Sequence, residues 1–190
     1  MRIRVACLLA VSLIALWIGG CVPSLNALYT DDTAIEDPQL LGDWVDKENR
    51  TIVAFAKGQG KAYTLAHTSP EWPHANFIVY VVELGGSKFL DVYPNVKAEE
   101  NPMREVHLIP AHTFCKYWID KNGLHLAPLS PDWLRDKIEK KEVDLPHQMV
   151  ENTLLLTAPT DKLQAFVKKY AGDKDAFGEG AGDNLKRRKQ

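Results

Sequence analysis

Two apolar segments joined by a pair of glycines place the strongest constraint on how this chain can fold. Residues 77–84 read Phe-Ile-Val-Tyr-Val-Val-Glu-Leu, and residues 88–93 return after a turn at Gly85-Gly86. Apolar β-branched and aromatic residues on both sides of a glycine turn are typical of a β-hairpin. The centre of the chain is therefore predicted to be an antiparallel sheet.

The rest of the chain adds further short strands and, late in the sequence, two helices. Ser130 followed by Pro131 is a typical helix start, and this helix is predicted to run to about Lys141. Thr160 is predicted to cap a second helix, which Gly172 ends. The predicted strands are 41–46, 51–57, 61–67, 77–84, 88–93, 105–109, 112–119, 124–129 and 153–158.

Strands in hairpin order with helices only at the end predict a mainly β fold. We expect an antiparallel sheet closed into a barrel or near-barrel, with two C-terminal α-helices. Another antiparallel α+β fold is the alternative.

The first 20 residues have the pattern of a secretory signal peptide. Arg2 and Arg4 give a short basic start, and residues 5–18 form an uncharged apolar run. This run is shorter than the roughly 20 residues that cross a bilayer as a helix. Small residues follow it, as cleavage requires. A plain cleaved signal or an uncleaved anchor is the alternative.

Ile18-Gly19-Gly20-Cys21 resembles the lipobox of bacterial lipoproteins, which is an aliphatic residue, two small residues and a cysteine. The resemblance implies cleavage before Cys21, which becomes the lipidated N-terminus and the link to the membrane. Two or more acyl chains make such an anchor stable. Val22 follows where aspartate would mark the inner membrane in many enteric bacteria. The implied location is the bacterial envelope, at the periplasmic face of the outer membrane.

The mature chain, Cys21–Gln190, has 170 residues, which is enough for one domain with a hydrophobic core. Residues 21–38 contain turn formers and no period, so we expect a lipidated N-terminus and tether. Residues 39–172 are predicted to form the β domain with its two helices. Residues 173–190 are glycine-rich and polar with a basic end, which predicts a disordered tail.

Charge and cysteine content exclude two classes of protein. Without the signal peptide the chain has 21 basic and 25 acidic residues, a net charge of −4, which argues against nucleic-acid binding. Cys7 leaves with the signal and Cys21 takes the lipid. Cys115 is therefore predicted to be an unpaired and unreactive thiol, and no disulfide is expected.

Leu40-Leu41-Gly42-Asp43-Trp44 resembles the Gly-x-Trp start of the first strand in lipocalins and other calycins. The resemblance implies a lipocalin-like barrel whose closed end is plugged by the indole of Trp44. Lipocalins usually carry an arginine late in the barrel that stacks on this tryptophan. Here no arginine lies between Arg135 and Arg187, and Thr160-Asp161 is read as a helix start instead of a strand motif.

Two other segments, 84–94 and 155–160, together with 40–44, are similar to segments of a class of uncharacterised bacterial lipoproteins. This likeness spans most of the mature chain and implies no activity.

No pattern of residues predicts an enzyme, a metal site or a cofactor. The six histidines form no His-x-x-x-His or His-Glu-x-x-His motif. His107 and His112 share a strand region interrupted by Pro110, and only a bend there would bring them together, whereas a metal site needs three or four converging ligands. There is no Gly-x-Ser-x-Gly, and Ser130 is explained as a helix cap.

Several residues are candidates for binding a small ligand if the barrel holds a cavity. Most of the strand aromatics also suit a filled core. Asp91, in an apolar strand, is either an outward-facing residue or a polar group inside the cavity, and Trp72 is either at the barrel mouth or simply exposed. The candidate ligand-binding residues are Trp44, Phe55, Tyr63, Trp72, Tyr80, Asp91 and Trp118.

Two functions follow, both without catalysis. The first is binding of a small hydrophobic or amphipathic molecule in the barrel. The second is an envelope module that docks another protein and has a filled core. An interior cavity of several hundred cubic ångströms favours the first function, and a solidly packed interior favours the second.

Overall fold

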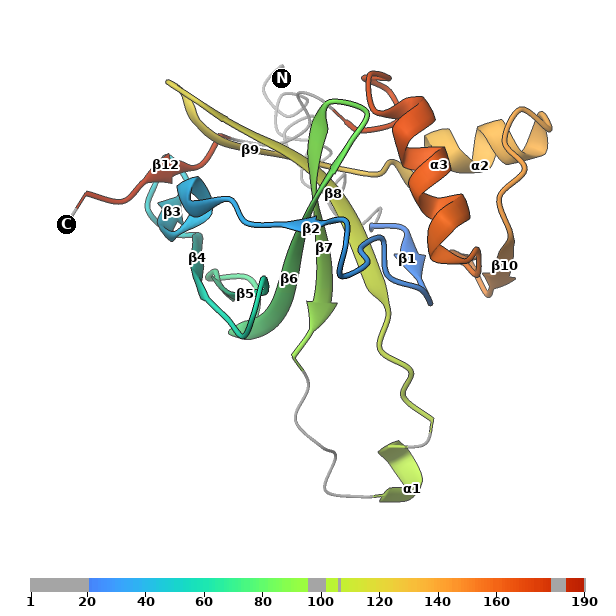
Figure 1. Cartoon of the computed structure of the whole chain (residues 1–190). Helices are drawn as coiled ribbons and strands as arrows, with labels where there is room; N and C mark the ends of the chain where they lie inside the picture. The colour runs from blue at the N-terminus through green and yellow to red at the C-terminus, as the bar shows by residue number, and fades with distance from the viewer. Residues whose placement is uncertain (1–20, 96–101, 106, 179–183, 190) are drawn as a thin grey trace, which may run out of the picture.

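A computed structural model describes residues 21–95, 102–105, 107–178 and 184–189 of the chain (Figure 1). The predicted signal peptide, residues 1–20, lies outside the described residues. The elements in chain order are β1 (Pro23–Ser24), β2 (Ala34–Ile35), the 3-10 helix η2 (Pro38–Leu40), β3 (Gly42–Val45), β4 (Ile52–Lys57), β5 (Tyr63–Thr68), β6 (Ala75–Leu84), β7 (Ser87–Pro94), α1 (Pro102–Glu105), β8 (His112–Asp120), β9 (Gly123–Pro128), α2 (Pro131–Glu139), β10 (His147–Val150), β11 (Thr153–Leu156), α3 (Thr160–Tyr170) and β12 (Lys186–Arg187).

One large mixed sheet contains all of these strands. Hydrogen-bonded neighbours run in the open order β10-β11-β1-β8-β7-β6-β5-β4-β3-β12, with β9 paired to β8 and β2 paired to β6. The pairs are antiparallel apart from β1 with β11. The prediction of a mainly β fold with helices after the central strands is confirmed, while α1 and strand β10 were not predicted.

The central hairpin of β6 and β7 forms as the glycine pair predicts. Leu84 pairs with Ser87 across Gly85 and Gly86, whose φ angles are 59° and 73°. These left-handed values suit glycine and match the twist of a two-residue hairpin. A Cβ at Gly85 would lie 3.0 Å from the Lys168 carbonyl oxygen, so the hairpin tip packs directly on α3.

The two faces of the sheet carry separate hydrophobic cores. Val79 and Val81 point to one face, and Val82 and Leu84 point to the other, as the alternation of a strand requires. The second face is covered by α2 and α3, which lie together on one side of the sheet (Figure 1). The first face holds the cluster that we call the Trp44 core: Leu40, Trp44, Val53, Phe55, Tyr63, Leu65, Val79, Val81, Leu90, Tyr117, Leu124 and Leu185.

The start of α2 confirms its predicted cap, and the start of α3 corrects one. The Ser130 hydroxyl accepts a hydrogen bond from the Trp133 N–H at 3.2 Å, and Pro131 occupies the first turn. In α3 the N-cap is Pro159, and Thr160 lies inside the helix. The Thr160 hydroxyl donates to the Ala27 carbonyl at 2.7 Å, so it binds the N-terminal segment and not its own helix.

The predicted strand at 105–109 is wrong. Glu105 ends helix α1, and Leu108 and Ile109 are exposed residues without strand pairing. They belong to the link between β7 and β8, whose described residues are 95, 102–105 and 107–111 and whose helix α1 lies away from the sheet (Figure 1). We call this segment the β7–β8 connection. Apolar residues alone predicted a strand here, but no neighbouring strand is available to complete its hydrogen bonds.

The segment expected to be a tether, 21–38, is instead packed against the sheet. Val22 and Leu28 are buried, β1 pairs with both β8 and β11, and β2 pairs with β6. Its strands are two residues long, so they carry no visible period in the sequence. Burial of these apolar side chains and pairing on the sheet explain its order.

The tail expected to be disordered, 173–190, is also packed where it is described. Ala176 and Phe177 are fully buried against the helix-covered face. Near the C-terminus, Leu185 exchanges hydrogen bonds with Leu124 of β9, and β12 pairs with β3. The charge of Lys186–Lys189 suggested solvation, but backbone pairing holds this segment in place.

Arg187 covers the indole ring of Trp44. Its guanidinium lies 4.3 Å from the centre of the Trp44 ring, and it donates to the carbonyl oxygens of Leu41 at 2.6 Å and Gln39 at 2.7 Å. Gly42, with φ of 111°, has no side chain to obstruct this approach. No arginine lies between Arg135 and Arg187, as the sequence showed, but Arg187 itself covers Trp44.

Candidate functional site

A buried carboxylate and a partly exposed imidazole form the most unusual polar pair of the structure. Asp91 of β7 is fully buried, and its Oδ1 lies 2.6 Å from Nδ1 of His112, the first residue of β8. Its Oδ2 accepts a hydrogen bond from the Leu28 N–H at 2.5 Å. Because a buried carboxylate accepts hydrogen bonds, His112 donates from Nδ1, which leaves Nε2 on the outer edge of the ring.

Three tyrosines surround this pair. Tyr29 stacks on Tyr80 with ring centres 3.7 Å apart, and Tyr93 lies 4.5 Å from the His112 ring. Tyr80 pairs directly with Asp91 across β6 and β7, so both side chains share one face of the sheet. Burial, followed by the neighbouring Tyr80 and Asp91, raises the pKa of Tyr29 to about 12, so its phenol stays protonated.

The geometry orients the His112 ring, but its neighbour on β1 is not placed as a nucleophile that it could activate. Ser24 is its partner on β1, yet the Ser24 hydroxyl is buried and donates to the Asn26 carbonyl at 2.8 Å. Asp91 and His112 therefore hold together β7, β8 and the N-terminal segment. Chemically, the exposed edge of the ring can exchange hydrogen bonds with a ligand.

A cleft of about 540 Å³ lies on the outside of the sheet beside Tyr80, and we call it the Tyr80 cleft. Tyr63 and Tyr80, both predicted ligand residues, line it, together with Ala34, Ile78 and the β4–β5 turn. Its volume is within the range of small-molecule sites. Asp31, Thr64 and Asn95 give it a few polar groups.

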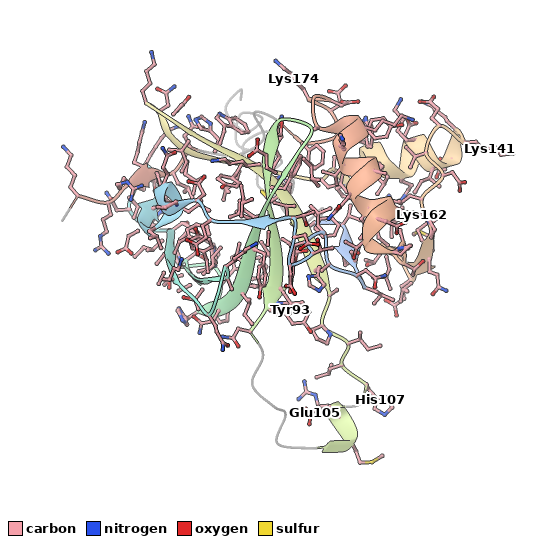
Figure 2. The ribbon with its side chains drawn as sticks, in the orientation of Figure 1. Tyr93, Glu105, His107, Lys141, Lys162 and Lys174 are labelled. Carbon is pink, nitrogen blue, oxygen red and sulfur yellow. The ribbon has the colours of Figure 1, made fainter. Side chains whose placement is uncertain are left out.

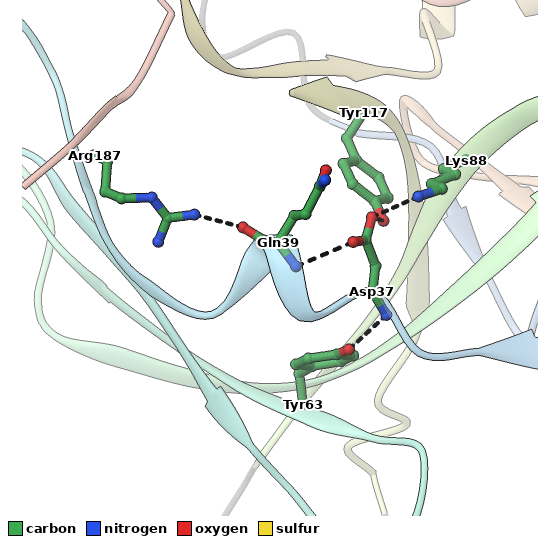
Figure 3. Close-up of polar contacts among 6 residues, drawn as sticks. All are labelled: Asp37, Gln39, Tyr63, Lys88, Tyr117 and Arg187. Atoms are coloured by element: carbon green, nitrogen blue, oxygen red, sulfur yellow. Dashed lines mark hydrogen bonds and ion pairs between the residues drawn. The ribbon is translucent and has the colours of Figure 1, made fainter. Parts of the chain in front are cut away.

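Asp37, the second buried carboxylate, contacts two residues of the Trp44 core, Tyr63 and Tyr117 (Figure 3). Lys88 Nζ and the Tyr117 hydroxyl each donate to its Oδ2 at 2.8 Å, and its own N–H donates to the Tyr63 hydroxyl at 2.7 Å. Burial raises the pKa of Asp37, but hydrogen bonds from Lys88, Tyr117 and Gln39 outweigh it, so the net pKa is lowered. Burial and the bond to Asp37 raise the pKa of Tyr117.

A second cleft of about 540 Å³ opens beside this carboxylate. Asp37, Lys88 and Lys116 line it together with Trp118, another predicted ligand residue. Lys88 is engaged by Asp37, and Lys116 donates to the Ala171 carbonyl at 2.9 Å. Both lysine ammonium groups are thus bound within the fold.

The structure separates the remaining predicted ligand residues. Trp44 and Phe55 are buried in the Trp44 core and line none of the clefts described above. Trp72 is 61% exposed in the β5–β6 loop. Asp91 is fully buried and binds His112, so its reading as an outward-facing residue is wrong. The seven residues therefore do not form one site.

Sequence reasoning missed His112, Tyr29 and Asp37 as members of polar clusters. His112 was considered only with His107 as a metal ligand, and Tyr29 and Asp37 lay in the expected tether. The signal available in the sequence was Asp91 itself, since an acid within an apolar strand needs a partner.

In the described part of the chain, no three histidine, cysteine or acidic side chains converge as metal ligands. Likewise, none of the described helices has the length and hydropathy to span a membrane. Cys115 is unpaired, and burial raises the pKa of its thiol, which makes it a poor nucleophile.

Comparison of the chain with protein-family models, with curated proteins and with solved structures finds no match.

Proposed function

We propose that this chain is a lipid-anchored protein of the bacterial envelope that docks another envelope protein and performs no catalysis. The observation that carries the proposal is the exposed apolar surface of the β7–β8 connection. Met103, Leu108 and Ile109 are 72%, 50% and 75% exposed. Large apolar side chains gathered on a projecting segment are typical of a binding surface.

The packing of the sheet supports docking over an interior ligand. Trp44 and Phe55 are buried in the Trp44 core and line neither of the two clefts. We further propose that the strands from β3 to β9 form a lipocalin-like near-barrel. The pairing of β12 with β3 and of Leu185 with Leu124 supports this arrangement.

The envelope location rests on the first 21 residues. A basic start, a short apolar run and the lipobox-like Ile18–Cys21 support export and lipidation of Cys21. Val22 in place of aspartate supports the outer membrane. No cofactor, metal or nucleic acid is part of this proposal.

Site-specific photocrosslinking in cells tests the docking surface. A photoreactive amino acid at Ile109 is expected to give a discrete protein adduct, because this side chain is exposed on the connection. The matched control is Lys141 at the end of α2, which Figure 2 places far from the connection. A photoreactive amino acid at Met103 is expected to capture the same partner, and Ile109→Asp is expected to weaken that capture. No adduct from Ile109 and Met103, or the same adduct from Lys141, contradicts the proposal.

A small amphipathic ligand is the second candidate, and the Tyr80 cleft favours it. The cleft has the volume for such a molecule, and its lining mixes apolar groups with a few polar ones. Native mass spectrometry of residues 22–190 tests this candidate. A stoichiometric adduct that Tyr80→Ala removes supports a ligand, and a bare mass counts against it.

A further inference from the structure

We propose that the ribbon formed by β10, β11 and β1 lies directly on the lipid bilayer, with its outer face against the headgroups. The proposal rests on the proposed lipidation of Cys21. We place a bilayer against this ribbon because Cys21, the residue proposed to carry the lipid, directly precedes β1.

The chain provides no slack between the lipid and the fold. Val22, the residue after Cys21, is 1% exposed and belongs to the hydrophobic core. Pro23 and Ser24 pair with β8 on one side and β11 on the other, and the Leu25 N–H donates to the Leu156 carbonyl at 2.9 Å. Cys21 is exposed at the surface. One residue spans at most about 3.6 Å, so the bilayer lies within a few ångströms of β1.

Alternation along β1 and β11 shows which face is free to meet the bilayer. Val22 and Ser24 are buried, so Pro23, which lies between them and is only half-buried, points to the opposite face. Leu154 and Leu156 are buried in the same way, and the half-buried Leu155 between them points outward. Ser24 pairs with Leu156, which places Pro23 and Leu155 on the same outer face.

Strand β10 extends this face with an exposed apolar residue. Val150 pairs with Thr153, and Gln148 pairs with Leu155, so both share the outer face. Val150 is 51% exposed. Pro23, Leu155 and Val150 are outside both core clusters. This face of the ribbon therefore presents the exposed apolar side chain of Val150 beside the half-buried Pro23 and Leu155.

The register places Cys21 at the Val150 end of the ribbon. Because β1 and β11 are parallel, moving from Ser24 back to Cys21 corresponds to moving from Leu156 towards Thr153. Thr153 is the partner of Val150. Neighbouring strands lie about 4.8 Å apart, so the lipid leaves the chain on the order of 10 Å from Val150.

The same register directs the proposed docking surface away from the bilayer. Ser24 is opposite His112, where β8 begins and the β7–β8 connection ends. Cys21 is at the other end of β1. Figure 1 shows α1, the helix of the connection, well away from β10 and α3. Contact with the bilayer at the ribbon thus leaves Met103 and Ile109 in water, available to a partner.

Fluorescence quenching on vesicles tests this orientation with the full, lipidated chain. The variants Val150→Cys and Gln148→Cys each receive an environment-sensitive label, and Met103→Cys is the matched control. Cys21 is blocked by the lipid, and burial makes the Cys115 thiol unreactive. Wild-type protein treated with the same label should therefore take up none. The vesicles contain phosphatidylethanolamine, phosphatidylglycerol and a lipid with a nitroxide near the headgroup.

We expect the nitroxide lipid to quench the labels at 148 and 150 at least twofold more than the label at 103. Equal, weak quenching at all three positions overturns the proposed orientation, and stronger quenching at 103 reverses it. Flotation and the intact mass are measured on the same samples. A protein that floats with a lipidated mass but shows equal quenching refutes the orientation alone. An unlipidated mass without flotation refutes the anchor and the orientation together.

Discussion

The Asp91 carboxylate binds the His112 imidazole at 2.6 Å and, through its other oxygen, the Leu28 N–H at 2.5 Å. A single buried group thus joins strands β7 and β8 to the N-terminal segment. The pair is expected to hold that segment on the sheet whether or not His112 contacts a ligand.

Replacement of Asp91 with alanine is expected to lower the free energy of unfolding by about 2–4 kcal/mol, because it leaves two donors facing a buried space. Asp132→Ala, on the exposed first turn of α2, is the control and is expected to change it by less than about 0.5 kcal/mol. Urea unfolding followed by circular dichroism measures both. Equal effects of the two variants contradict a pinning role for Asp91.

Replacement of Arg187 with alanine is expected to destabilise the fold by about 1–3 kcal/mol, since it removes the contact with Trp44 and two hydrogen bonds to carbonyl oxygens. Arg188→Ala is the matched control, because Arg188 is exposed and lies 3.8 Å from Asp43, a pair worth little. Thermal unfolding and the near-ultraviolet circular dichroism of the tryptophans report the change. A loss from Arg188→Ala as large as that from Arg187→Ala is the result that argues against this role.

Gly42→Ala is expected to cost more than about 1 kcal/mol for two reasons. The φ angle of 111° disfavours any side chain, and the new Cβ would lie 2.9 Å from Arg187 Nη1. Gly172→Ala, where a Cβ meets open space, is expected to be neutral. In a double-mutant cycle with Arg187→Ala, the cost of Gly42→Ala should fall. Strict additivity would show that the contact with Arg187 plays no part.

Asp37 is expected to make stability depend on acid pH. Its folded pKa is lower than its ordinary value of 3.8. Its contribution is therefore fully present above that value and is lost as the pH falls through the lower folded pKa. Asp37→Asn should be destabilised by about 1–3 kcal/mol at pH 7 and much less at pH 3. Urea unfolding at pH 7, 5 and 3 measures the difference, and a difference independent of pH would contradict the prediction.

Tyr29 is expected to titrate late in alkali. Its pKa is raised to about 12, so the folded state keeps a proton that the unfolded chain releases near pH 10. The stability that it contributes is present below pH 10 and is lost as the pH rises towards 12. Absorbance at 295 nm should show a transition near pH 12 that Tyr29→Phe removes. An unchanged titration curve in that variant would show that the transition near pH 12 does not come from Tyr29.

Local sequence signals predicted the central hairpins and both late helices because their causes are local. Gly85-Gly86 readily adopts the positive φ angles of a two-residue turn, and Ser130-Pro131 caps a helix within one turn. The segments at the two ends were misread because their order comes from distant partners. Leu28 is fixed by Asp91, and Leu185 is fixed by Leu124. Strands of two residues are too short to show a hydrophobic period, so the local sequence does not predict them.

The candidate sites were predicted only in part, for a related reason. Asp91 and Tyr80 were chosen separately, and the register between β6 and β7 made them neighbours. His112 joined them because β7 and β8 also pair, across a long connection whose register no turn residue specifies. Trp44 and Phe55 were correctly placed on strands, but their alternation did not reveal whether the space between them was empty or filled.

Arg187, in the last described strand, β12, covers Trp44 in β3. The two residues are far apart in the sequence, so this contact forms late in synthesis. The lid over Trp44 forms only after residue 187 has been synthesised and has paired with β3. Until then Trp44 lacks this cover, and incomplete chains expose it to proteases and chaperones.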